Sequence, residues 1–455
     1  MRTFLKIAGL AVIASGSAAA MAADKLDGRW DAQLVRGDNV IPFRLDISGS
    51  GPTLKGTLYD GFRPYEDTTS ASFKDGQLTL NIEHYLTTIS AKFEDGKLVG
   101  TVVAQNRENR ADYKFVAAPH VDAPPAAVNA PAIAGSWEIP LEAPSSKGEK
   151  AFRLIVDQKG AEVAASILRV DGDTGAYSGT FKDGKWVLSH FDGSRPGVIV
   201  VTPGKEGTLE IQQRVDRPQQ TAETKSGGEK AYGESAPDGR YASKLVAYRT
   251  EVARAKGFPE PANYLTHTTA RDPNEKFAFN FKDVNGKPVS SDDPQFKGKV
   301  IVAIVTGTWC PNCHDEAQYL VQLDKKYREK GLAIVALDFE EAEQQDSLTR
   351  VHAFVKQYGV KYPYLIAGAP AEMWEKVPQL VNLNTWPATV FVGRDGTVRA
   401  VHAGFASPAS GEFHAQLKKE FSGRIEQLLA EKAPAQLTSA TEANAGSSAL
   451  VADAR

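Results

Sequence analysis

Polar and apolar residues alternate in short runs through the first half of the chain, and this period of two predicts β-strands. Runs of this kind cover residues 43–47, 54–59, 78–82 and 98–103. Asp-Gly pairs separate several runs, and such pairs are typical of tight turns between antiparallel strands. The pattern therefore predicts an antiparallel all-β region.

An internal repeat divides this β-rich region into two copies. Three short sequences recur in the same order at an offset of about 108 residues: Gly28-Arg29-Trp30 and Gly135-Ser136-Trp137, Phe43-Arg44-Leu45 and Phe152-Arg153-Leu154, and residues 72–76 and 180–184. Each copy holds enough short runs for about eight strands, the number in small up-and-down barrels. We therefore predict a duplicated antiparallel barrel or sandwich. The opening Gly-x-Trp resembles that of lipocalin and avidin-type barrels.

The pattern changes near residue 276, where strands begin to alternate with amphipathic helices. Residues 300–305 and 332–337 are entirely apolar, which favours buried strands. Helical spacing predicts helices over residues 311–330 and 347–358, and a final helix with an apolar face formed by Phe413, Leu417, Phe421, Ile425 and Leu428. Asn285-Gly286 and Asp395-Gly396 predict hairpin turns. The C-terminal part is therefore expected to be an α/β domain.

The N-terminus has the pattern of a secretory signal. Arg2 and Lys6 are basic, residues 7–14 are apolar, and Ala20-Met21-Ala22 matches a cleavage site. The apolar run is shorter than the ~20 residues that cross a bilayer. We expect an exported protein, soluble after cleavage, in a bacterial periplasm.

Composition marks the segments between the folded units. Pro and Ala predict a linker at 119–132, residues 216–239 are irregular, and residues 243–256 are expected to form a connecting helix. The expected organisation is a signal peptide (1–22), β repeat 1 (23–118), a linker (119–132), β repeat 2 (133–225), a connector (226–275), the α/β domain (276–431) and a disordered tail (432–455).

The chain has two cysteines, Cys310 and Cys313, which stand at C-x-x-C spacing after the apolar strand at 300–305. Cysteine pairs in exported proteins are mostly structural, but domains of this size bury enough apolar surface without disulfides. Two thiols at a strand-to-helix turn can close into a reversible disulfide. The formal net charge of −3 lacks the basic bias of a nucleic-acid-binding protein.

The order of elements resembles a thioredoxin fold, and residues 276–430 are similar to the TlpA/ResA-like family of exported thioredoxins. The resemblance is carried by the hairpin, Gly298-Lys299-Val300, residues 308–313, Glu316, a strand that ends near Asp338, and Trp386-Pro387-Ala388-Thr389. It implies a thiol–disulfide oxidoreductase, mostly acting as a reductant of exported disulfide-bearing proteins such as apocytochrome c. A membrane electron donor would supply the electrons.

The expected roles follow from the chemistry and from the resemblance. Cys310 stands at a helix N-terminus, where backbone N–H groups favour a thiolate that attacks a substrate disulfide. Cys313 lies one turn on and resolves the mixed disulfide. The resemblance implies that Glu316 tunes thiol protonation and that Trp386-Pro387 is a cis-proline pair. We expect the substrate groove to be lined by Trp309, Pro311, Trp386 and Pro387, with no metal and no cofactor beyond the redox disulfide.

Two positions depart from the pattern of related proteins. Trp386 is bulky where small or β-branched residues are common, which would narrow substrate choice. Ile304 stands where thioredoxins proper place a buried acid, so that their proton route is not assumed here.

Other interpretations of the motif remain open. Cys310 to His314 also spells C-x-x-C-H, the attachment pattern of c-type haem, with Met373 as a second axial ligand. We expect His314 to be exposed on the helix instead. Structural zinc would need a second Cys or His pair, and a peroxiredoxin would need Thr or Ser where Gly307 stands.

Two further alternatives concern the whole chain. The domain could act as a disulfide oxidant. The β repeats could also form a ligand-binding or partner-binding protein with an accessory redox domain, or a structural spacer.

Overall fold

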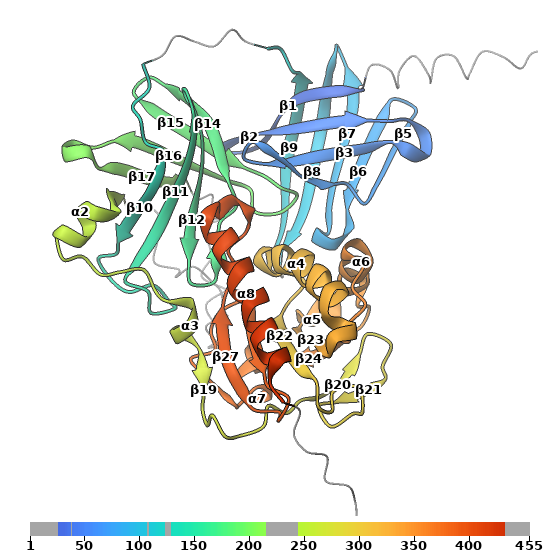
Figure 1. The fold of residues 1–455 in the computed structure, drawn as a ribbon. Helices are drawn as coiled ribbons and strands as arrows, with labels where there is room; N and C mark the ends of the chain where they lie inside the picture. Colours follow the sequence, from blue (N-terminus) through green and yellow to red (C-terminus); the bar gives the residue numbers. More distant parts are fainter. Residues whose placement is uncertain (1–25, 38, 107–108, 123–128, 215–243, 433–455) are drawn as a thin grey trace, which may run out of the picture.

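The computed structural model describes residues 26–37, 39–106, 109–122, 129–214 and 244–432. The predicted signal peptide, the irregular stretch at 216–239 and residues 433–455 of the predicted tail lie outside these ranges. Figure 1 shows two β units, blue and green, that lie side by side on one end of an α/β unit. Within the described ranges, no helix is long and apolar enough to cross a lipid bilayer.

The first β unit is a nine-stranded antiparallel sheet in the order β4-β3-β2-β1-β9-β8-β7-β6-β5. Its strands are β1 (Gly28–Arg36), β2 (Asn39–Ser48), β3 (Lys55–Asp60), β4 (Arg63–Asp67), β5 (Ser70–Lys74), β6 (Gln77–Ile82), β7 (Thr87–Glu94), β8 (Lys97–Asn106) and β9 (Asn109–Pro119). The end strands β4 and β5 are joined through Thr68 and Thr69, so the sheet curls upon itself. Side chains alternate between the core and the surface, as the period of two predicts.

The second β unit repeats this order and closes. Its strands are β10 (Gly135–Pro140), β11 (Ala151–Lys159), β12 (Glu162–Arg169), β13 (Gly172–Asp173), β14 (Tyr177–Lys182), β15 (Lys185–His190), β16 (Gly197–Pro203), β17 (Leu209–Arg214) and β18 (Leu245–Arg249). They follow the order β11-β10-β18-β17-β16-β15-β14-β12-β13, and β11 also pairs with β12. This extra pairing makes the sheet a closed barrel.

The predicted duplication is confirmed in detail. Trp30 and Trp137 are both buried, and each indole N–H donates at 2.9 Å to the carbonyl four residues earlier, that of Leu26 or Ile133. Each copy has nine strands where we expected about eight. The additional strand is the short β4 in the first copy and the two-residue β13 in the second.

The prediction of a helix throughout residues 243–256 is wrong for its first half. Leu245–Arg249 is strand β18, which pairs with both β10 and β17, and only Thr250–Ala255 forms a helix, α2. The pairing edges of β10 and β17 need a partner strand to close the barrel. This long-range requirement, which a local reading of the sequence cannot show, explains why residues 245–249 form a strand.

The α/β unit contains a seven-stranded mixed sheet in the order β21-β20-β24-β23-β22-β26-β27. Its strands are β20 (Asn280–Asp283), β21 (Pro288–Ser290), β22 (Val300–Thr306), β23 (Leu332–Phe339), β24 (Tyr364–Gly368), β26 (Ala388–Val392) and β27 (Val398–Ala403). A separate pair is formed by β19 (Thr269–Ala270) and β25 (Leu380–Val381). The helices are α3 (Tyr264–His267), α4 (Pro311–Tyr327), α5 (Ala342–Gln345), α6 (Thr349–Tyr358), α7 (Met373–Lys376) and α8 (Glu412–Ala430).

The predicted strands and long helices of this unit are present, and β22, β23 and β24 run parallel in its centre. Helices α4, α6 and α8 bury their apolar faces in one cluster on one side of the sheet. Buried side chains also pack against one another across the boundaries between the three units. Leu168 of β12 belongs to that helical cluster, and Phe191 of the second β unit packs 4.9 Å from Phe43 of the first.

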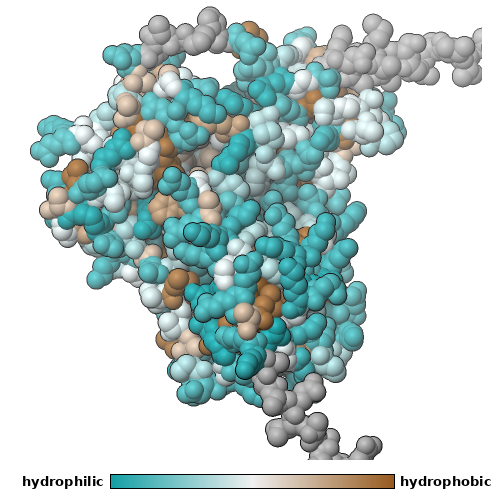
Figure 2. All heavy atoms as spheres, in the orientation of Figure 1, coloured by the Kyte–Doolittle hydropathy of each residue, from teal (hydrophilic) through white to brown (hydrophobic). Residues whose placement is uncertain are grey.

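The visible surface of the molecule is consistent with this burial of apolar side chains. Figure 2 shows a face that is mostly hydrophilic, with apolar residues in small scattered groups. The large apolar side chains of the described residues lie mostly in the buried cores of the three units.

Candidate functional site

The two cysteines lie at the N-terminus of α4. Strand β22 ends at Thr306, Cys310 is the N-cap residue, and Pro311 is the first helical residue, where a missing N–H costs nothing. The Cys310 N–H donates to the Gly307 carbonyl at 3.0 Å, and the Cys313 N–H donates to the Cys310 carbonyl at 3.0 Å. This tight turn places both thiols on the same side of the N-terminus of α4. Cys310 is 5% exposed and Cys313 only 1%.

The loop before β26 faces this turn. The Trp386–Pro387 peptide bond is cis, as the resemblance implies. The Cys310 thiol donates to the Trp386 carbonyl at 3.4 Å. The indoles of Trp309 and Trp386 meet edge to face at 5.1 Å, and Trp309 Nε1 donates to the Phe339 carbonyl at 2.9 Å. The structure thus places Trp309 and Trp386, two of the residues that we predict to line a substrate groove, beside Cys310.

Glu316 is buried one helical turn after Cys313. The Thr389 hydroxyl of β26 contacts its Oε1, and its Oε2 has no hydrogen-bond partner within the described ranges. Burial raises the pKa of Glu316 to about 8, although the Thr389 hydroxyl acts to lower it. Burial, followed by the hydrogen bond and charge of Cys310, raises the pKa of Cys313 well above its ordinary value. The site therefore holds two buried groups behind Cys310, the Cys313 thiol and the Glu316 carboxyl, whose raised pKa values favour their protonated forms.

A buried ion pair supports the loop that leads into the motif. Arg350 of α6 is 1% exposed, and it contacts Glu340 and lies 2.8 Å from a carboxylate oxygen of Glu341. The Arg350 Nε donates at 3.1 Å to the Thr308 hydroxyl, which also contacts Glu340. Because Thr308 lies two residues before Cys310, this network holds the backbone next to Cys310.

Replacing Arg350 with Met is expected to lower the free energy of unfolding by about 3 kcal/mol, because buried carboxylates lose their cation. Urea unfolding near pH 7 measures this loss. The matched control is Arg399→Met, which removes a more exposed pair with Asp395 in the same unit. The control should cost less than about 1 kcal/mol, and equal losses in both variants would contradict the prediction.

The expectation that His314 is exposed is wrong, because its exposed fraction is 0%. Its ring lies 4.2 Å from the ring of Tyr85, which belongs to the first β unit, and 4.7 Å from that of Phe354. This β unit covers the helix face that α4 would otherwise present to water. Burial lowers the pKa of His314 well below its ordinary value, so the ring is neutral.

Both ring nitrogens of His314 are engaged. Nε2 lies 2.6 Å from the Thr308 carbonyl, and Nδ1 lies 2.9 Å from the Tyr358 hydroxyl. Both nitrogens therefore have partners within the protein, and Met373 is buried in the core. These contacts do not fit the haem interpretation. In the described part of the chain, no group of three or more His, Cys, Asp or Glu could hold a metal ion.

Both β units reach the motif, which the sequence did not reveal. The Tyr65 hydroxyl from the first unit donates at 2.6 Å to Asp315. Arg195 from the second unit donates at 3.4 Å to the Asn312 side chain and lies 3.6 Å from Asp315. The Asn312 amide in turn donates at 2.8 Å to the Asp171 carbonyl. Sequence spacing carries no signal for these contacts.

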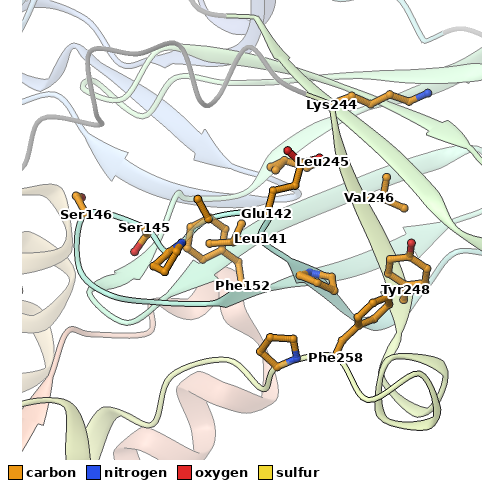
Figure 3. Close-up of a pocket in the computed structure, with 14 residues that line it drawn as sticks. Leu141, Glu142, Ser145, Ser146, Phe152, Lys244, Leu245, Val246, Tyr248 and Phe258 are labelled. Atoms are coloured by element: carbon orange, nitrogen blue, oxygen red, sulfur yellow. The ribbon is translucent and has the colours of Figure 1, made fainter.

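The second β unit also holds a cavity of about 440 Å³ that none of these residues lines. Figure 3 shows its mostly apolar lining, with side chains that come from both ends of the second repeat and from the segment after α2. They include Leu141, Phe152, Leu245, Tyr248 and Phe258. The cavity is therefore separate from the cysteine site.

Comparisons with known proteins agree on the α/β unit. Residues 269–417 match the Redoxin family. The chain is 34% identical over 116 residues to the thiol-disulfide oxidoreductase ResA of Bacillus thuringiensis (strain Al Hakam), covering 26% of this chain and 60% of that protein. It is 30% identical over 128 residues to the thioredoxin-like protein YneN of Bacillus subtilis (strain 168), covering 28% of this chain and 68% of that protein.

Among solved structures, a secreted Mycobacterium tuberculosis disulfide oxidoreductase homologous to E. coli DsbE is similar, with 24% identity and a TM-score of 0.26. The match covers 34% of this chain and 99% of that one.

The fold and the C-x-x-C turn define an α/β redox domain of the thioredoxin type. Through this domain the chain belongs to the thioredoxin-like redoxin family, and it is similar to the ResA proteins. The chain spans 60% of the length of the first of these relatives. The family match begins at residue 269, so it does not include the β repeats.

Proposed function

We propose that this protein is an exported thiol–disulfide oxidoreductase that reduces disulfides in other exported proteins. The observation that carries the proposal is the placement of Cys310. Its thiol lies at the N-terminus of α4 against the Trp386 carbonyl beside the cis-proline, with Cys313 buried one turn behind. The names of the ResA relatives support the same chemistry.

The reaction transfers two electrons from the dithiol to the substrate. The Cys310 thiolate attacks one sulfur of the substrate disulfide, which forms a mixed disulfide and releases the other substrate sulfur as a thiolate. Cys313 loses its proton and attacks the Cys310 sulfur, which closes the Cys310–Cys313 disulfide and releases the second substrate thiolate. Both leaving thiolates take up protons, and an external dithiol restores the enzyme.

Glu316 would act as the proton acceptor for Cys313. A buried thiol with a raised pKa needs a nearby base before it can attack. The Glu316 carboxyl has a pKa of about 8, close to the working range of such a base. Trp309, Pro311, Trp386 and Pro387 would form the substrate groove, and a membrane protein would deliver the electrons.

The test uses the whole mature protein, reduced and freed of reductant. Mixed with a disulfide protein such as insulin, it should release substrate thiols and become oxidised itself. The reduction potential of the Cys310–Cys313 pair then decides the direction. A reduction potential of about −270 mV fits a reductant, whereas a potential of about −120 mV would show an oxidant and contradict the proposed direction. Absence of thiol release would contradict the activity.

A further inference from the structure

A turn of the second β unit lies directly on the redox domain. It consists of Val170 and Asp171, which lie between β12 and β13, and of Gly172, the first residue of β13, and it is called the covering turn here. The Asp171 carbonyl accepts hydrogen bonds from the Asn312 side chain at 2.8 Å and from the Phe405 N–H at 3.4 Å. Gly172 also forms a parallel bridge with Phe405. The turn therefore pairs with the redox domain much as an added strand would.

The fit is close enough to require glycine on both sides. A Cβ on Gly172 would lie 2.3 Å from the Phe405 carbonyl oxygen and 2.7 Å from the Asn312 amide nitrogen. A Cβ on Gly404 would lie 2.3 Å from the Val170 carbonyl oxygen. Both glycines have positive φ, +121° and +70°. The backbone of the covering turn packs directly against the backbone of the redox domain, so no space remains between them for another polypeptide segment.

This contact lies beside the cis-proline. The Gly404 N–H donates at 2.8 Å to the Pro387 carbonyl, so the segment that the turn covers is bonded directly to the cis-proline loop. The carbonyl of Trp386, the residue before this proline, accepts the hydrogen bond of the Cys310 thiol. With the turn in place, Cys310 is only 5% exposed. A polypeptide that binds along this groove would meet the covering turn.

Further contacts hold the turn in place. The buried carboxylate of Asp173, directly after the turn, accepts hydrogen bonds from the Ser407 N–H at 2.7 Å, the Ser407 hydroxyl at 2.8 Å and the Ser410 hydroxyl at 2.6 Å. Arg195 holds Asn312 from the same β unit. Hydrogen bonds to a charged group are stronger than neutral ones, so the covered arrangement is well anchored.

We propose that the covering turn competes with polypeptide substrates for the groove beside Cys310 and thereby determines which disulfides react. The inference rests on the proposed function, since it concerns access to the same thiol. A small disulfide needs only a path to the Cys310 sulfur. An extended polypeptide disulfide that runs past Cys310 over Asn312 would meet the covering turn, which occupies the backbone groups of Phe405 and the space over Asn312. Polypeptide substrates therefore react only when the turn has moved.

Two variants open the turn, and a third controls for backbone strain. Gly172→Ala introduces the clash with Phe405 and Asn312, and Asp173→Ala removes the anchor on Ser407 and Ser410. Gly28→Ala is the matched control. Its φ is +131°, similar to that of Gly172, but its Cβ would meet no atom within 4 Å. Circular dichroism establishes that each variant is folded.

Three rates are measured on the reduced proteins: alkylation of Cys310 by iodoacetamide, reduction of a ten-residue peptide disulfide, and reduction of glutathione disulfide. In Gly172→Ala and Asp173→Ala, both alkylation and peptide reduction should rise at least about tenfold, which is the effect of losing one or two hydrogen bonds from the covered state. The peptide rate should rise more than the glutathione rate. Gly28→Ala should match the unmodified protein.

Unchanged or lower rates in the folded variants would overturn the proposal. If neither variant folds, the unmodified protein decides, because it should reduce glutathione disulfide at least about tenfold faster than the peptide disulfide. An equal or faster peptide rate would overturn the proposal. Faster alkylation without any disulfide reduction would instead refute the proposed function, whereas the inferred effect of the covering turn on access to Cys310 would stand. The two failures are therefore distinguishable.

Discussion

Cys310→Ser is expected to lower the rate of disulfide exchange by at least about a thousandfold, because loss of the nucleophile removes covalent catalysis altogether. A serine hydroxyl at the N-terminus of α4 is not ionised near neutral pH and cannot form a mixed disulfide. Thiol release from insulin by the reduced protein measures this loss. The Cys310 thiol makes only weak hydrogen bonds, to the Trp386 carbonyl and with Cys313, so the melting temperature should change little.

Cys313→Ser is the matched partner of this variant and should behave differently. Cys310 still attacks, but no second thiol resolves the product, so a mixed disulfide with the substrate accumulates. Mass spectrometry of the alkylated reaction mixture detects the adduct. Both variants carry the same Cys→Ser change, so a difference between them separates the attack by Cys310 from the resolution by Cys313. Full activity in both variants, or accumulation of the adduct on Cys313 in the Cys310→Ser variant, would contradict the mechanism.

Glu316→Gln is expected to remove a pH dependence of stability that amounts to about 5 kcal/mol between pH 4.5 and pH 9. The folded-state pKa of about 8 lies above the ordinary value of 4.5, so the folded protein binds the proton more tightly than the unfolded chain. Below pH 4.5 both states carry the proton, and the carboxyl costs nothing. As the pH rises toward 8, the unfolded chain releases its proton and the folded protein loses stability.

A neutral Gln keeps an acceptor for the Thr389 hydroxyl and has no charge to bury. The variant should therefore match the original protein near pH 4.5 and become more stable than it as the pH rises to 9. Urea unfolding across this range measures the difference. Glu375→Gln, at an exposed position in α7, is the control and should leave the pH dependence unchanged. Parallel curves for the original protein and Glu316→Gln would contradict the assigned environment.

The same variant addresses function. If Glu316 accepts the proton of Cys313, then its loss should slow resolution of the mixed disulfide and leave the attack by Cys310 unchanged. A structural role alone would not separate these two steps.

Local patterns predicted much of the redox unit. The apolar runs at 300–305 and 332–337 are the parallel strands β22 and β23, and the helical spacing after Cys310 is α4. These features depend on neighbours within a few residues, because side-chain direction repeats every two residues in a strand and about every 3.6 in a helix. The cysteine spacing and the Trp386-Pro387 pair are equally local.

Tertiary structure decided the features that depend on distant partners. Strand β18 lies in a segment that we expected to be helical, but it closes a barrel with β10 and β17. His314 looked like a surface residue of α4, and it is buried because the first β unit packs its Tyr85 there. No periodicity in the sequence records which surface another unit will cover.

The sequence by itself determined that this protein has a duplicated β region and a thioredoxin-type domain with a Cys310–Cys313 pair at a helix N-terminus. Only the tertiary structure decided that the pair is enclosed. Tyr65, Asp171 and Arg195 reach the motif from more than 100 residues away in the chain. The physical reason is that backbone patterns are set by local geometry, whereas access to a thiol is set by packing between units.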